Sequence, residues 1–196
     1  VDVVVENFTS GTTDRLGVGY AAARAANERI VYCSISGYGA TQEFGKGVMD
    51  SIAQGLSGAM LAGGLPGDPP NRAGIPLADT VAPLFGVIGI CSALLRAKET
   101  GVGDHVDISM LGALTSLVAT EDWHAMQALG QPLRTGRTLP RISPFGIYRC
   151  SDGYVSLVAP YDKFAHALFH AIGRPELITD PRFASVSARA TRNEER

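Results

Sequence analysis

Two short apolar runs frame the beginning of the chain. Residues 1–5 and 30–36 are rich in β-branched side chains and almost continuously apolar, as expected of strands buried on both faces. Residues 13–26, which lie between them, carry a helical pattern dominated by alanine. This strand–helix–strand arrangement predicts two parallel strands joined by a crossover, and residues 105–109 predict a third strand.

The next part of the chain predicts apolar helices separated by a loop. Residues 63–76 contain four glycines and four prolines and predict the loop. The long stretch 79–99 is rich in Leu, Ile, Val and Ala, and Gly86 and Gly89 within it are expected to mark close packing. Pro83 is assigned to the first turn, where a missing N–H costs little. Two further helices are predicted at 49–61 and 111–129.

The pattern changes near residue 133. Two apolar runs flank Ser151-Asp152-Gly153, which predicts a β-hairpin, and an amphipathic helix is expected at 163–172. We therefore expect an α/β fold in which residues 1–135 belong to a large parallel-sheet domain. Residues 136–196 would begin a smaller α+β domain. The hairpin strands are expected at 145–150 and 154–159.

Composition narrows the possible functions. Hydrophobic residues make up 45% of the 196 residues and charged residues 18%, which is enough apolar material for a packed core. The net charge is −2 and no basic block is present, which argues against nucleic acid as the main partner. No uninterrupted apolar run reaches about 18 residues, so no membrane partner is expected.

The cysteines and the N-terminal pattern favour a cytoplasmic location. Cys33, Cys91 and Cys150 are odd in number and widely spaced, which fits reduced thiols better than a disulfide framework. Their apolar flanks predict that all three are buried. The chain starts on an apolar run without the basic segment that precedes the apolar part of a signal peptide.

Two motif-like patterns are set aside. The glycines in Gly17-Val18-Gly19-Tyr20-Ala21-Ala22 do not directly follow a predicted strand, as a dinucleotide-binding turn must. His166 and His170 have helical i, i+4 spacing, but a third metal ligand is missing from the pattern, so they are interpreted as surface or partly packed residues. No metal site is expected.

The order and spacing of several stretches resemble the class III (family III) coenzyme A-transferases. This superfamily includes formyl-CoA transferase, carnitine CoA-transferase and α-methylacyl-CoA racemase. The resemblance covers essentially the whole chain. It rests on residues 4–17, 30–39, 50–58, 74–79 with their continuation through 100–110, 152–155, 173–176 and 180–183.

The resemblance implies a Rossmann-like, CoA-binding large domain and a catalytic role for Asp79. In the family this carboxylate forms a mixed anhydride with the acyl group and then an aspartyl-CoA thioester, with acyl-CoA and a carboxylic acid as substrates. Asn7, Phe8, Arg15 and Met110 match positions near the CoA. Family members are longer at both ends and form interlocked homodimers.

The residues themselves leave alternatives open. Pattern alone favours Asp79 as a helix N-cap. Arg15 is suited to phosphate oxygens but could instead form an ion pair with Asp14 or Glu6, and Met110 could be a core residue.

Other members of the superfamily imply rival functions. The racemases place a His before the residue at the position of Asp50, and a Glu in the small domain. Met49 and Tyr161 occupy these positions here, which disfavours racemisation. Residues 141–145 replace the glycine-rich lid of formyl-CoA transferases, which argues against formyl or oxalyl specificity. The alternatives to CoA transfer are a racemase-like enzyme and an inactive truncated or interaction chain.

Overall fold

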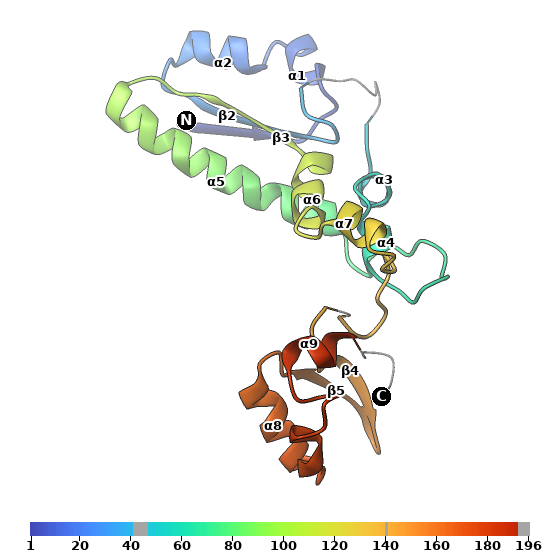
Figure 1. Cartoon of the computed structure of the whole chain (residues 1–196). Coiled ribbons are helices and arrows are strands. Elements are labelled where there is room, and N and C mark those ends of the chain that lie inside the picture. Colours follow the sequence, from blue (N-terminus) through green and yellow to red (C-terminus); the bar gives the residue numbers. More distant parts are fainter. Residues whose placement is uncertain (41–46, 140, 192–196) are drawn as a thin grey trace. The chain divides into compact units, whose positions relative to one another are not determined.

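The computed structural model describes residues 1–40, 47–139 and 141–191 (Figure 1). The chain divides into two compact units. Unit 1 comprises Val1–Ala62 and Pro70–Ala125, and unit 2 comprises Gly63–Pro69 and Met126–Arg196. Residue 140 lies outside the described residues, and the domain boundary predicted at 135/136 stays a prediction.

Unit 1 contains a three-stranded parallel sheet in the order β1-β2-β3. The strands are β1 (Val3–Glu6), β2 (Val31–Ser36) and β3 (His105–Ser109). Central β2 pairs with β1 from Val3↔Val31 onward and with β3 from Tyr32↔His105 onward. Its position between two strands buries its first residues almost completely. The predicted α/β class with a parallel sheet is confirmed.

Helices cover both faces of this sheet (Figure 1). Helix α2 (Tyr20–Ala26) lies on one face, where Tyr20 stacks on His105 with ring centroids 4.7 Å apart. Helix α5 (Leu77–Thr100) packs against β2 and β3 on the other face. A Cβ on Gly89 would lie 2.5 Å from Cγ1 of Val106, so the close packing predicted for this helix is confirmed.

Three predicted helices are each broken into two. The stretch 13–26 forms α1 (Thr12–Arg15) and α2, because Gly17 adopts φ 74° between them. The stretch 49–61 forms α3 (Asp50–Leu56) and α4 (Ala59–Ala62), separated by Gly58 with φ 86°. The stretch 111–129 forms α6 (Met110–Val118) and α7 (Trp123–Ala128).

The third break has a side-chain cause. The Asp122 carboxylate accepts a hydrogen bond from the Ala125 backbone N–H at 2.8 Å and caps the start of α7. The indole N–H of Trp123 donates to the Val118 carbonyl at 3.2 Å, at the end of α6. These two bonds satisfy backbone groups at the end of α6 and the start of α7, and so allow the helix to break. The continuous pattern of apolar residues does not reveal this break.

The outward face of α5 remains apolar and exposed. It includes Leu84, Val87, Ile88 and Leu95, each more than half exposed. By length and composition α5 is the one helix of the described residues that could cross a membrane, a property that the core helix of a soluble protein often shares. The expectation of no membrane partner stays a prediction.

The prediction that all three cysteines are buried is wrong for two of them. Cys33 is buried, but Cys91 and Cys150 are exposed. Cys91 lies on α5, where apolar flanking residues do not imply burial because part of the helix surface is both apolar and open. Burial, reinforced by the charges of Glu6 and Asp107, raises the pKa of the Cys33 thiol.

Unit 2 contains the predicted hairpin, formed by antiparallel β4 (Phe145–Cys150) and β5 (Gly153–Val158). It is followed by α8 (Asp162–Ala171), a 3₁₀ turn η1 (Pro175–Ile178) and α9 (Val186–Thr191).

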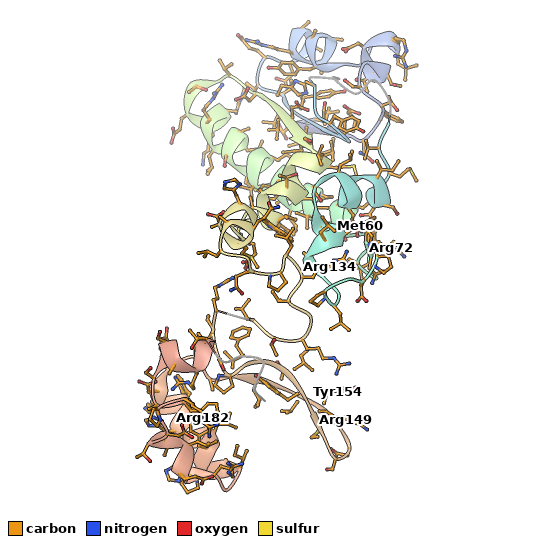
Figure 2. All side chains as sticks on the ribbon, turned by 45° about the vertical axis from the view of Figure 1, so that its right-hand side comes forward. Met60, Arg72, Arg134, Arg149, Tyr154 and Arg182 are labelled. Carbon is orange, nitrogen blue, oxygen red and sulfur yellow. The ribbon has the colours of Figure 1, made fainter. Side chains whose placement is uncertain are left out.

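Two buried arginines hold segments of unit 2 together. Arg189 donates to the Ser143 and Phe183 carbonyls at 3.0 and 2.9 Å and to the Asp162 carboxylate at 2.8 Å. Arg134, labelled in Figure 2, donates to the Pro69 carbonyl at 2.9 Å and so connects residues 63–69 to the rest of the unit.

Substitution of Gly89 by Ala tests the packing of α5 on β3. Overpacking costs about 1–3 kcal/mol, which outweighs the gain of up to about 1 kcal/mol from placing alanine in a helix. We expect Gly89→Ala to lower the free energy of unfolding in urea titrations. The control is Gly74→Ala, because a Cβ at Gly74 meets nothing within 4 Å. An unchanged or raised stability of Gly89→Ala would contradict the packing.

Candidate active site

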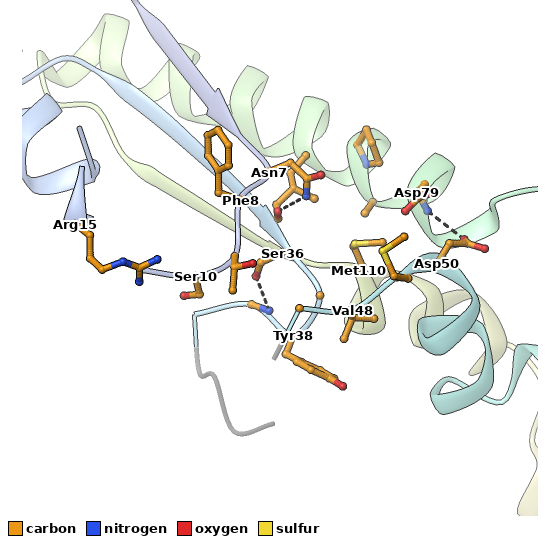
Figure 3. A pocket seen from close by; sticks show the side chains of 18 residues that line it. Asn7, Phe8, Ser10, Arg15, Ser36, Tyr38, Val48, Asp50, Asp79 and Met110 are labelled. Atoms are coloured by element: carbon orange, nitrogen blue, oxygen red, sulfur yellow. Dashed lines mark hydrogen bonds between the residues drawn. The ribbon is translucent and has the colours of Figure 1, made fainter. Parts of the chain in front are cut away.

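A cavity of about 750 Å³ opens at the carboxyl ends of β1 and β2 in unit 1 (Figure 3). Ligands of parallel α/β sheets commonly bind at this edge, where the loops that follow the strands converge. All five residues singled out from the sequence line the cavity. They are Asn7, Phe8, Arg15, Asp79 and Met110.

The segment after β1 forms one wall. The Asn7 side-chain amide donates to the Ile35 carbonyl at 2.5 Å, which joins this segment to the end of β2. The Phe8 backbone N–H donates to the Glu6 carboxylate at 2.7 Å. These bonds fix the backbone, while Phe8 is 56% exposed and lines the cavity.

The segment after β2 forms a second wall. Gly39 has φ 79°, a left-handed conformation that favours glycine, and its N–H donates to the Ser36 hydroxyl at 3.0 Å. The next amide, of Ala40, donates to the Asp107 carboxylate at 2.8 Å. The turn is therefore held by side chains from β2 and β3 before any ligand is present.

Asp79 lies in the first turn of α5. It is exposed, and among the described residues its carboxylate accepts no hydrogen bond. The residue at the N-cap is Pro76, so the interpretation of Asp79 as the N-cap is wrong. The carboxylate oxygens keep their lone pairs and reach the cavity near the positive end of the helix dipole.

Pro83 was predicted in the first turn of the helix, but it lies in the second turn because α5 begins at Leu77. Proline has no backbone N–H, so it cannot supply the helical hydrogen bond to the carbonyl of Asp79. Both residues line the cavity.

Arg15 is the last residue of α1 and lies on the side of the cavity opposite Asp79 (Figure 3). Its guanidinium donates to the Thr12 hydroxyl at 3.0 Å. In the part of the chain that the structure describes, it forms no ion pair, so the alternative pairing with Asp14 or Glu6 is wrong. Most of its donors remain open toward solvent, which suits phosphate oxygens.

Met110 is a core residue that also lines the cavity, and its contact with CoA stays a prediction. It is 6% exposed and belongs to a core cluster with Ala53, Ala82 and Leu114. It also lines the cavity. A polarizable thioether at this place gives the cavity an apolar boundary that is continuous with the core.

Asp50 is a site residue that the sequence analysis did not identify. It is the first residue of α3, and its carboxylate accepts hydrogen bonds from the backbone N–H groups of Ala78 and Asp79 at 2.7 and 3.4 Å (Figure 3). Its separation of 29 positions from Asp79 hides this contact from local sequence patterns. The only available signal was its place within a stretch that carries the family resemblance.

Metal ligands do not gather in the described ranges 1–40, 47–139 and 141–191, where no group of three or more His, Cys, Asp or Glu side chains is placed to hold an ion. His166 and His170 both lie on α8 in unit 2.

All 196 residues match the model of CoA-transferase family III. The chain is 37% identical to acetyl-CoA:oxalate CoA-transferase of Acetobacter aceti, over 98% of this chain and 50% of the relative. It is 32% identical to succinate–glutarate CoA-transferase of Agrobacterium fabrum, over 96% of this chain and 47% of the relative.

Solved structures give the same result. A CAIB/BAIF family protein from Brucella suis superposes with a TM-score of 0.80 at 33% identity, over 99% of this chain and 52% of that one. The chain thus spans about half the length of the relatives that it matches. Because the family model matches from the first residue to the last, the chain belongs to CoA-transferase family III.

Proposed function

We propose that this chain belongs to an enzyme that transfers coenzyme A between an acyl-CoA and a carboxylic acid, with Asp79 as the nucleophile. The observation that carries the proposal is the Asp79 carboxylate, exposed in the cavity and without a hydrogen-bond partner among the described residues. The relatives are all named as CoA-transferases, but their names give different acids. They therefore support CoA transfer as the class of reaction and do not identify the acid that accepts CoA.

The reaction would proceed through covalent intermediates on Asp79. The carboxylate attacks the acyl-CoA carbonyl and expels CoA thiolate, which leaves an acyl–aspartyl anhydride. The thiolate then attacks the aspartyl carbonyl, so the first acid departs and an aspartyl-CoA thioester remains. The incoming carboxylate attacks this thioester, and the released thiolate attacks the new acyl group to form the new acyl-CoA. The covalent intermediates divide one difficult exchange into several easier steps.

The cavity walls suit the CoA molecule. Arg15 would bind phosphate oxygens at one end of the cavity, and the Phe8 ring would pack on the adenine or the pantetheine chain. Asn7, whose amide holds the wall beside Phe8, and Met110 would complete the CoA surface. No metal is required by this chemistry.

A racemase-like reaction is the rival enzymatic function. Racemisation moves a proton at the carbon beside the thioester and needs an acid and a base on opposite sides. Met49 lines the cavity next to Asp50 and has no titratable group. An α-proton exchange assay in D₂O distinguishes the two, since CoA transfer breaks no bond to an α-proton and therefore predicts no exchange, whether or not an acceptor acid is present. An inactive or interaction chain would show neither reaction.

Location and assembly are also proposals. Three free cysteines, without a disulfide, support a cytoplasmic location. The exposed apolar face of α5 supports a homodimer, because contiguous apolar surface of this kind usually marks an interface.

Replacement of Asp79 by Asn tests the nucleophile. The amide is nearly isosteric but does not form the anhydride, so we expect kcat for acid-to-acid CoA transfer to fall by about 10³-fold or more. Acyl-CoA followed by hydroxylamine should convert Asp79, detected by mass spectrometry, to its hydroxamate. Asp122→Asn is the matched control, because Asn also caps helices. Near-normal turnover of Asp79→Asn would exclude the mechanism.

Replacement of Arg15 by Ala tests the phosphate contact. Loss of a hydrogen bond to a charged group costs about 1.5–3 kcal/mol, so KM for acyl-CoA should rise by about tenfold or more while kcat changes little. Arg24→Ala, which removes an exposed arginine of α2 outside the cavity, is the control. Equal KM values for the two variants would show that Arg15 does not contact CoA.

The exposed face of α5 predicts self-association. Sedimentation equilibrium at tens of micromolar should give a dimer or a larger species, and Ile88→Glu should weaken the association by placing a charge in the apolar surface. Asp2→Glu, at an exposed position just before β1 and conservative in charge, should leave the mass unchanged. A clean monomer for the unchanged chain would rule out this assembly.

A further inference from the structure

Gln54 is a buried polar residue whose side-chain amide bonds both to Asp50 and to the segment that precedes α5. It lies on α3 one turn after Asp50, and its exposed fraction is 0%. Its amide nitrogen donates to the Asp50 carboxylate at 2.6 Å and to the Ile75 carbonyl at 3.2 Å. Its amide oxygen accepts from the Ala73 N–H at 2.8 Å. Both ends of the amide are therefore satisfied and oriented.

The Asp50 carboxylate passes this orientation on to α5. One oxygen faces Gln54, and the other accepts the N–H groups of Ala78 and Asp79. The first amides of a helix have no partner within the helix, and the N-cap residue Pro76 has no side chain that can accept them. Asp50 thus caps α5 from a neighbouring helix.

The Asp79 side chain has no such support of its own among the described residues, so its position depends on its backbone. That backbone is held by the Asp50 carboxylate, and the approach to it is held at Ala73 and Ile75 by Gln54. We propose that Gln54 and Asp50 form a brace that positions Asp79 for reaction. Both are positioning residues, and their effect on turnover rests on the proposed function.

The brace has a fixed pattern of donors and acceptors that substitutions can break and restore. Gln54→Glu places two carboxylates against each other at the 2.6 Å contact, and Asp50→Asn can place two amide donors there. In the double variant the new amide at position 50 donates to the new carboxylate at position 54, whose other oxygen still accepts from Ala73. The charge is the same as in the original pair, but the bond to the Ile75 carbonyl is replaced by a contact between two acceptor oxygens.

The test compares the two single variants and the double variant, each made in the full-length protein. A misplaced nucleophile costs about 100-fold in rate, so each single variant should lower kcat to about that extent. KM should change far less, because neither Asp50 nor Gln54 is among the residues proposed to contact CoA. The double variant should recover most of the loss. Gln127→Glu, which adds a carboxylate at an exposed position of α7, should have no effect.

Amide hydrogen exchange of residues 76–82 provides a readout that does not need turnover. Protection of Ala78 and Asp79 should fall in each single variant and return in the double variant. Unchanged protection, or kcat that stays low when protection returns, would overturn the brace. If the unchanged protein transfers no CoA, the proposed function fails, and the positioning role in turnover fails with it even when amide exchange changes in the variants as expected. If the unchanged protein transfers CoA but exchange is the same in all variants, only the brace is excluded.

Discussion

The capping of α5 by Asp50 is the interaction on which the site depends. A 24-residue helix begins at the edge of an open cavity, and its first amides need acceptors. The Ala78 N–H finds one in the Asp50 carboxylate at 2.7 Å. This single side chain connects α3 to α5 where both meet the cavity, so the relative position of the two helices and the place of Asp79 are set together.

Small side chains make this arrangement compact. The cluster beneath the cap contains Ala53, Ala78 and Ala82, and each is fully buried. Further along α5, Gly86 and Gly89 bring the helix backbone close to β2 and β3. Cores with short side chains allow the backbones themselves to approach, and such contacts have few rotamers through which to relax. Asp79, the proposed nucleophile, therefore lies on a helix whose inner face packs closely against β2 and β3.

The sequence predicted the parts of the fold that follow from hydrophobic periodicity. The three strands, the long helix and the hairpin have strong local patterns, and the structure contains all of them. The helix breaks escaped prediction because Gly17 and Gly58 adopt positive φ, which is a matter of tertiary context, and because the Asp122 cap acts through one carboxylate. Periodicity also could not tell which apolar positions face outward, as Cys91 shows.

The site divides in the same way. Asp79 was identified through the family resemblance, since local pattern alone favoured a cap. Arg15 had a chemical argument, and its open guanidinium in the cavity agrees with that argument. Asp50 and Gln54 stayed hidden because their partners in α5 and in the segment before it are 19 to 29 positions away in the sequence. Contacts at that separation depend on how α3 and α5 pack, which no local pattern records.

A carboxylate nucleophile poses a particular problem of positioning. Hydrogen bonds to its own oxygens would fix it well, but they would occupy the lone pairs that must attack a carbonyl and would lower its nucleophilicity. The alternative is to fix the backbone that carries it and leave the side chain unbound. Asp79 follows this second solution, because its N–H is held by Asp50 while its carboxylate accepts no bond within the described residues. A second carboxylate beside the proposed nucleophile thus has a clear use, since Asp50 accepts hydrogen bonds from the helix amides.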